Sequence, residues 1–194
     1  AIADVSDRFQ VNINLLTHLE YERVQVLMKQ EGMSIADAKR QADHEILSAF
    51  FELNDYEMAE DLDIFGNREG DAALLAINIL LLANNGEGDF MERFALLDQD
   101  LADDGLWNDS LLKAKIADDA CKVDFMTGFS RIRKNMEDWK ISENIAPFES
   151  YVRSFWEKDF GLGKCDASLW GKKKKNTNEA SSFYGIEFIC DSLG

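Results

Sequence analysis

The sequence changes character near residue 160, and this change limits the folds that the chain can adopt. Before it, apolar residues recur at helical spacing between charged residues through most of the chain. After it, a short segment rich in Gly, Lys and aromatic residues lies between Cys165 and Cys190. We therefore expect a mainly α fold, an antiparallel helical bundle with a small C-terminal β appendage closed by a disulfide.

The same patterns divide the chain into three predicted parts. Residues 1–11 are interpreted as a linker or short strand, residues 12–159 as a helical domain, and residues 160–194 as a small β unit bounded by Cys165 and Cys190. Ser34 followed by Asp37, and Asp89 followed by Glu92, are typical of capping boxes at helix starts. The first predicted helix begins near Asn12 and ends at Gly32, and the second begins at Ser34. Further helices are predicted at residues 72–83, 89–102, 109–136 with a break near Gly128, and 148–158 after Pro147.

The charge of the chain excludes one class of partner. Its 21 basic and 37 acidic residues give a net charge of −16, which repels phosphate backbones, so we expect no nucleic acid. Residues 172–175, four consecutive lysines, are a local exception. We interpret them as a solvated loop or a charged edge strand, and a docking patch for an acidic polymer or lipid headgroup is the alternative. No run of about 18 apolar residues predicts a membrane-spanning helix.

The cysteines suggest the compartment. Cys165 and Cys190 bracket a Gly-, Asn- and Ser-containing stretch, and closing a loop of that length stabilises a protein by about 3–4 kcal/mol. The alternative is two unrelated buried thiols in a cytosolic protein. Cys121 falls in a helical pattern and is interpreted as a core thiol. The start at Ala1 without Met and the end at Gly194 suggest a fragment of a longer precursor.

The acidic turns do not match a known metal-binding loop. In an EF-hand register that begins at Asp61, Phe65 and Ala72 occupy ligand positions, and in one that begins at Asp100, Ala102 and Leu111 do so. We interpret these acids as helix caps and solvated turns. The alternative is an irregular calcium site formed by Asp98, Asp100, Asp103 and Asp104. The two histidines, His18 and His44, lack zinc-ligand spacing, and the sequence predicts no catalytic residue, metal ligand or cofactor.

Aromatic residues give the best candidates for ligand binding. Trp170, Phe183 and Tyr184 lie in the terminal segment, and Trp rings on an exposed β surface can stack on sugars. Trp170, beside Gly171 and the lysines, is the ring that we expect to be most exposed. The alternative is that the aromatic residues form a small core between the helical domain and the β unit, together with Trp107, Trp139, Phe155, Trp156 and Phe160.

Several stretches resemble one bacterial family. They are VNINLLTHLEYERV from Val11, GMSIADAKRQA from Gly32, GDAALLAI from Gly70, DGLW from Asp104, KIAD from Lys115 and FWEKDFGLGKC from Phe155. Together they resemble the Fibrobacter paralogous-domain lipoproteins over nearly the whole chain, with residues 163–194 similar to the first of the cysteine-bounded repeats that usually follow. The resemblance implies export, a lipid anchor before residue 1, and an outer-membrane, cell-surface or periplasmic location, but no activity to transfer.

This chain departs from the family pattern by ending after one cysteine pair, with no Trp-Arg after Cys190. We expect a non-enzymatic exported lipoprotein module that is structural or binds a ligand such as cell-wall polysaccharide or another surface protein. It would meet the membrane through its lipid anchor alone. One alternative is a carbohydrate-active hydrolase with a carboxylate pair. Another is a protein-interaction scaffold whose acidic face meets basic partners.

Overall fold

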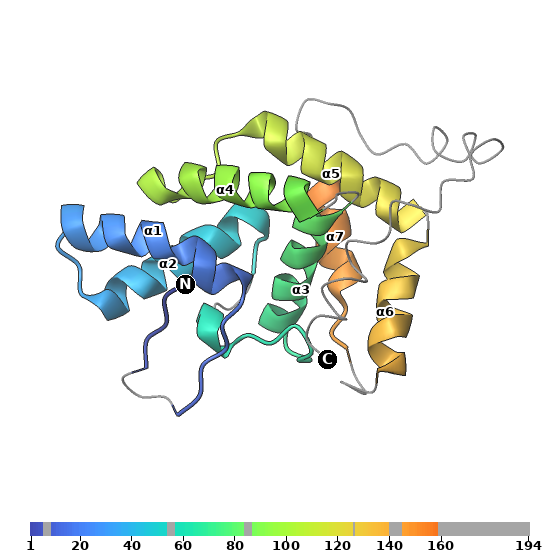
Figure 1. Ribbon diagram of the computed structural model, residues 1–194, viewed down its shortest axis with the longest axis horizontal. Helices are drawn as coiled ribbons and strands as arrows, with labels where there is room; N and C mark the ends of the chain where they lie inside the picture. The colour runs from blue at the N-terminus through green and yellow to red at the C-terminus, as the bar shows by residue number, and fades with distance from the viewer. Residues whose placement is uncertain (6–8, 54–56, 84–86, 126, 140–144, 159–194) are drawn as a thin grey trace.

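The computed structural model describes residues 1–158, except 6–8, 54–56, 84–86, 126 and 140–144 (Figure 1). Within this part the chain is mainly helical, and none of its described segments is a strand. No helix there has the length and apolarity needed to cross a membrane. The predicted β unit at 160–194 lies outside the described residues, together with Cys165, Cys190, Trp170, Phe183 and Tyr184.

Seven α-helices and one 3₁₀ turn make up the described part. They are α1 (Leu15–Gln30), α2 (Ile35–Phe50), the 3₁₀ helix η1 (Ala59–Asp61), α3 (Glu69–Leu82), α4 (Glu87–Asp104), α5 (Ser110–Phe125), α6 (Gly128–Asp138) and α7 (Phe148–Trp156). Each predicted helix is therefore present, although α3 begins three residues before the predicted start and α4 two residues before it. Pro147 directly precedes α7.

Polar side chains begin the first two helices. The Asn14 carboxamide accepts hydrogen bonds from the backbone N–H groups of Leu16 and Thr17, while the Thr17 hydroxyl accepts one from the Asn14 N–H. Ser34 accepts a hydrogen bond from the Asp37 N–H, as the sequence predicted. These bonds satisfy N–H groups that the helix itself cannot, and they fix where each helix starts.

The predicted break near Gly128 separates α5 from α6. Thr127 has a φ of 64°, in the left-handed region that side chains with a Cβ rarely adopt. A Cβ on Gly128 would lie 2.5 Å from Val123 Cγ1 and 2.7 Å from the Val123 carbonyl oxygen. Glycine is therefore required where the chain folds back closely over the end of α5, and the long helical pattern becomes two helices.

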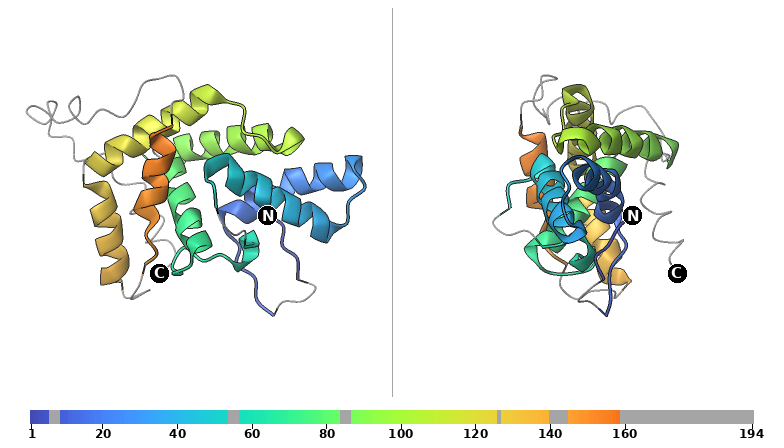
Figure 2. Two further views of the ribbon diagram at one scale, coloured as in Figure 1. Left: turned by 180° about the vertical axis from the view of Figure 1, so that it is seen from behind. Right: turned by 90° about the vertical axis from the view of Figure 1, so that its left-hand side faces the viewer.

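The helices do not form the simple antiparallel bundle that we expected. α1 and α2 make an antiparallel hairpin, and α4 packs against α1 (Figure 1). α4 and α5 then run across α3, α6 and α7, and the view from behind shows α6, α7 and α3 side by side in that order (Figure 2). The reason is that α3 is apolar on all sides: eleven of its residues are buried, so neighbours must cover it from several directions.

One large core joins most of the helices. Its centre holds an aromatic cluster of Phe50, Trp107 and Phe155, in which the Trp107 ring centre lies 4.9 Å from that of Phe50 and 5.8 Å from that of Phe155. Trp107 and Phe155 therefore belong to the helical core itself, as does the buried Trp156. Cys121 is fully buried in α5, as its helical pattern predicted, but it is disulfide-bonded and therefore not the core thiol that we expected.

Candidate functional site

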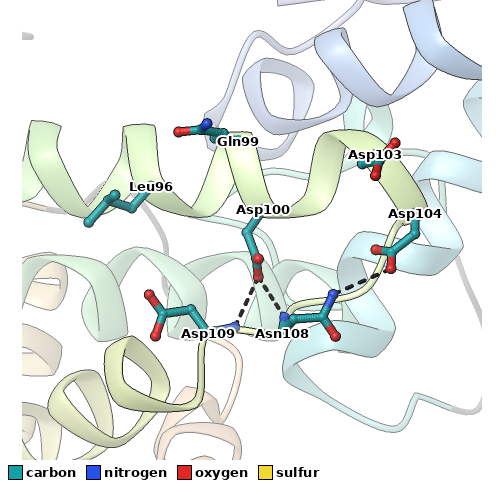
Figure 3. Close-up of a pocket in the computed structure, with 7 residues that line it drawn as sticks. All are labelled: Leu96, Gln99, Asp100, Asp103, Asp104, Asn108 and Asp109. Atoms are coloured by element: carbon teal, nitrogen blue, oxygen red, sulfur yellow. Dashed lines mark hydrogen bonds between the residues drawn. The ribbon is translucent and has the colours of Figure 1, made fainter.

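The acidic turn between α4 and α5 forms the first candidate site. Leu96, Gln99, Asp100, Asp103, Asp104, Asn108 and Asp109 line a hollow of about 390 Å³ (Figure 3). It contains three of the four acids of the predicted irregular calcium site. The fourth, Asp98, does not line it and is half-buried on α4, where burial and then the Glu22 charge raise the pKa of its carboxyl.

The carboxylates of this hollow already hold the turn together. Asp100 accepts hydrogen bonds from the backbone N–H groups of Asn108, at 2.6 Å, and Asp109, at 3.2 Å (Figure 3). Asp104 accepts one from the Leu106 N–H, and Asp109 caps α5 by accepting one from the Leu112 N–H. Asp100, Asp104 and Asp109 thus each use an oxygen as a cap or turn acceptor, as the first interpretation of this acidic turn predicted.

A second cluster of acids is buried between α1, α2 and η1. Glu20, Asp43 and Glu60 each offer an oxygen within 4.8 Å of the other two, a spacing that the acids around Asp100 do not reach among the described residues. Lys39 lies with them and pairs with Glu20 and Glu60. Glu20, Lys39 and Glu60 are at most 1% exposed and Asp43 is 3% exposed, so no substrate can reach this cluster.

The third candidate is an apolar groove between α3 and α6, called here the α3–α6 groove. Its lining is Ile64, Phe65, Leu75, Asn78, Ile79, Leu82, Ile132, Asn135, Met136 and Trp139. The groove has a volume of about 90 Å³, and none of these ten residues is charged. The groove is smaller than the roughly 300–1,000 Å³ of typical small-molecule pockets, so its case as a binding site rests on the uncharged lining, on a chain with 30% charged residues, and not on its size.

The sequence builds this groove from two helices and one loop. α6 buries Phe129, Ile132 and Met136, which recur at helical spacing, while Asn135 and Trp139 follow one turn apart on its edge. Trp139 ends α6 and stays 40% exposed. Across the groove, Asn78 interrupts the apolar run of α3 and donates one hydrogen bond to the Leu74 carbonyl. The groove therefore combines two aromatic rings, Phe65 and Trp139, with two carboxamides.

The sequence did not predict this groove. Trp139 was expected only in the alternative small aromatic core, and the predicted ligand-binding residues Trp170, Phe183 and Tyr184 lie outside the described residues. Asn135 and Trp139, four residues apart on one helix, are a signal that could have been noticed. Nothing in the sequence, however, indicates that Ile64 and Phe65 would lie beside α6, because some 70 residues separate them. Both histidines, His18 and His44, lie exposed on α1 and α2.

Comparison with known proteins gives no match: no family model, curated protein or solved structure is similar to this chain. The resemblance to the Fibrobacter lipoproteins therefore stays a prediction.

Proposed function

We propose that this chain is a non-enzymatic binding module of an exported surface lipoprotein, and that its helical domain binds a neutral glycan at the α3–α6 groove. The observation that carries this proposal is the uncharged, partly aromatic lining of the groove on a chain with a net charge of −16. Export rests on the family resemblance and on the cysteine-bounded terminal segment, which suits an oxidising compartment.

The chemistry of the groove fits a sugar better than an ion or a lipid tail. A sugar ring offers C–H faces that pack on an aromatic ring such as Trp139, and hydroxyls that pair with carboxamides such as those of Asn78 and Asn135. A charged ligand would find no counter-charge in the lining. An acyl chain would need a deeper enclosed cavity than this open groove of about 90 Å³.

The same lining argues against the carboxylate-pair hydrolase. Glycoside hydrolysis needs two carboxyl groups beside the scissile bond, and the α3–α6 groove is lined by neither Asp nor Glu. The buried acid cluster of Glu20, Asp43 and Glu60 is closed off from solvent. Binding without turnover is therefore the function that the described residues support best.

The test is a binding assay with insoluble cellulose and a panel of neutral oligosaccharides. We expect wild type to bind at least one of them, and Trp139→Ala to weaken that binding about tenfold, or about 1.4 kcal/mol. Tyr21→Ala is the matched control, because Tyr21 is 41% exposed on α1, far from the groove in sequence. It should bind as wild type does.

Two outcomes would contradict the proposal. If Trp170→Ala abolished binding and Trp139→Ala did not, the site would lie on the terminal segment, as the sequence first suggested. If wild type bound no glycan, the binding function would fail for this chain and leave a structural module or a protein scaffold. For a scaffold with an acidic face, captured partners should be released steeply as salt rises.

A further inference from the structure

The buried cluster of Glu20, Lys39, Asp43 and Glu60 contains more acid than base. Lys39 Nζ pairs with Glu20 Oε2, and it lies 3.0 Å from Glu60 Oε2. If all four groups were ionised, three carboxylates would face one ammonium group. An uncompensated charge that is removed from water costs several kcal/mol, so the cluster needs at least one further positive charge or proton.

Two oxygen atoms show where that proton belongs. Glu20 Oε1 and Asp43 Oδ2 are both buried and have no hydrogen-bond donor. Burial and the Asp43 charge raise the pKa of Glu20 to about 9, against the opposing effect of Lys39. Burial also raises the pKa of Asp43 to about 6, although Lys39 lowers it. A proton held between the two side chains would turn one acceptor into a donor and satisfy both.

A metal ion is the other way to balance these charges. The three carboxylates are close enough to share one. However, the Lys39 ammonium already contacts Glu20 and Glu60, so a cation occupies the centre of the cluster. Burial alone would lower the pKa of Lys39, but the surrounding carboxylates outweigh it and the pKa is raised. The ammonium therefore stays charged and would repel a metal ion.

The N-terminal residues are bonded to this cluster. The Asp4 N–H donates to Glu60 Oε1 at 2.9 Å, and Lys39 Nζ donates to the Ile2 carbonyl at 3.4 Å. The Ile2 N–H donates to the Thr17 carbonyl of α1, and the Ile2 side chain packs on the small core between α1 and α2. Residues 1–4 thus lie beside the α1–α2 hairpin (Figure 1), held by the same groups that share the charge.

We propose that residues 1–4 form a strap that docks on the α1–α2 hairpin while Glu20 and Asp43 share a proton, and that loss of this proton releases it. Ionising both carboxyl groups would set two like charges against each other where water is excluded. The groups that respond are Lys39 on α2 and Glu60 on η1, which hold the strap together with the Thr17 carbonyl of α1. The exposed His18 of α1, 3.4 Å from the Ala1 amino group, also faces the strap.

The first test is NMR titration of the whole chain. We expect the ¹³C signal of the Glu20 carboxyl to titrate far above its ordinary value of 4.5. We also expect the amide signals of Ile2 and Asp4 to shift with the same midpoint. A Glu20 carboxyl that titrates near its ordinary value would overturn the proposal, as would Ile2 and Asp4 signals that ignore its titration.

Two variants and a metal series complete the test. Glu20→Gln carries a permanent donor toward Asp43, so its strap signals should stay at the docked position at every pH. Glu22→Gln, an exposed change on the same helix, should titrate as wild type does. If Mg²⁺, Ca²⁺, Mn²⁺ or Zn²⁺ added to chelator-treated protein moved the Ile2 and Asp4 signals, and Glu20→Gln abolished that effect, a metal ion would replace the proton.

Discussion

Glu20 makes the stability of the fold depend on pH, because its carboxyl binds a proton more tightly in the folded protein than in the unfolded chain. Its pKa rises from 4.5 to about 9 on folding, chiefly through burial. Between these values the folded state holds a proton that the unfolded state has lost, so the free energy of unfolding falls as pH rises. The slope approaches about 1.4 kcal/mol per pH unit, the value for one proton.

This slope can be measured by urea unfolding between about pH 7, which is above the pKa of Asp43 of about 6, and about pH 9. We expect Glu20→Gln to remove most of it, since a carboxamide does not titrate. Glu22→Gln should keep the wild-type slope, because Glu22 is exposed on the same helix. Equal slopes in wild type and Glu20→Gln would mean that Glu20 is ionised in the folded protein.

The sequence pattern predicted the helix that carries Glu20 but not the burial of the Glu20 side chain. Glu20 lies on the buried side of α1 with Leu16, Leu19 and Leu27, at positions where an apolar residue would have been assigned to the core at once. A charged residue at such a position is normally assigned to the surface. Its neighbours in the cluster, Lys39, Asp43 and Glu60, are 19 to 40 residues away on α2 and η1, and helical periodicity carries no information about pairing at that distance.

At the scale of the helices, one buried ion pair joins α4 to α5. Arg93 and Asp119 pair through side chains that are 3% and 8% exposed, and Arg93 also reaches the Ala83 carbonyl. We expect Asp119→Asn to lower the free energy of unfolding by about 3 kcal/mol, because it leaves the Arg93 charge buried without a counter-charge. Urea unfolding at constant pH measures the difference.

The double variant Arg93→Met, Asp119→Leu is the control for this pair. It replaces both charges with apolar groups, so it should recover much of the stability lost by Asp119→Asn. If the double variant were as unstable as the single one, packing rather than an uncompensated charge would explain the loss.

The helices themselves were largely predictable, because local signals specify them. The Ser34 cap, the break at Gly128 and the apolar run of α3 are all in the sequence. What local signals could not give is how the helices cross. An apolar helix such as α3 accepts neighbours on any side. The sequence therefore could not predict that α4 and α5 run across α3, α6 and α7, which the structure shows (Figure 1). The α3–α6 groove depends on that crossing and was missed for the same reason.

At the scale of the whole molecule, the aromatic cluster of Phe50, Trp107 and Phe155 joins distant parts of the chain. These residues come from α2, the turn between α4 and α5, and α7. Phe155 is fully buried, and its ring centre lies 6.0 Å from that of Phe50. Because α2, near the start of the described part, and α7, at its end, share this cluster, the described part of the chain should unfold as one cooperative unit.

Phe155→Ala tests that cooperativity. It should lower the free energy of unfolding by about 3–5 kcal/mol, the usual cost of removing a buried aromatic ring. Because α2 and α7 depend on the same cluster, helix content by circular dichroism and tryptophan fluorescence should report one shared, shifted transition. Phe9→Ala, at a fully exposed ring, should change the stability by less than about 0.5 kcal/mol. Separate transitions in Phe155→Ala would instead mean that the α1–α2 hairpin and the helices around α3 are stable independently, and that the aromatic cluster joins two units rather than one.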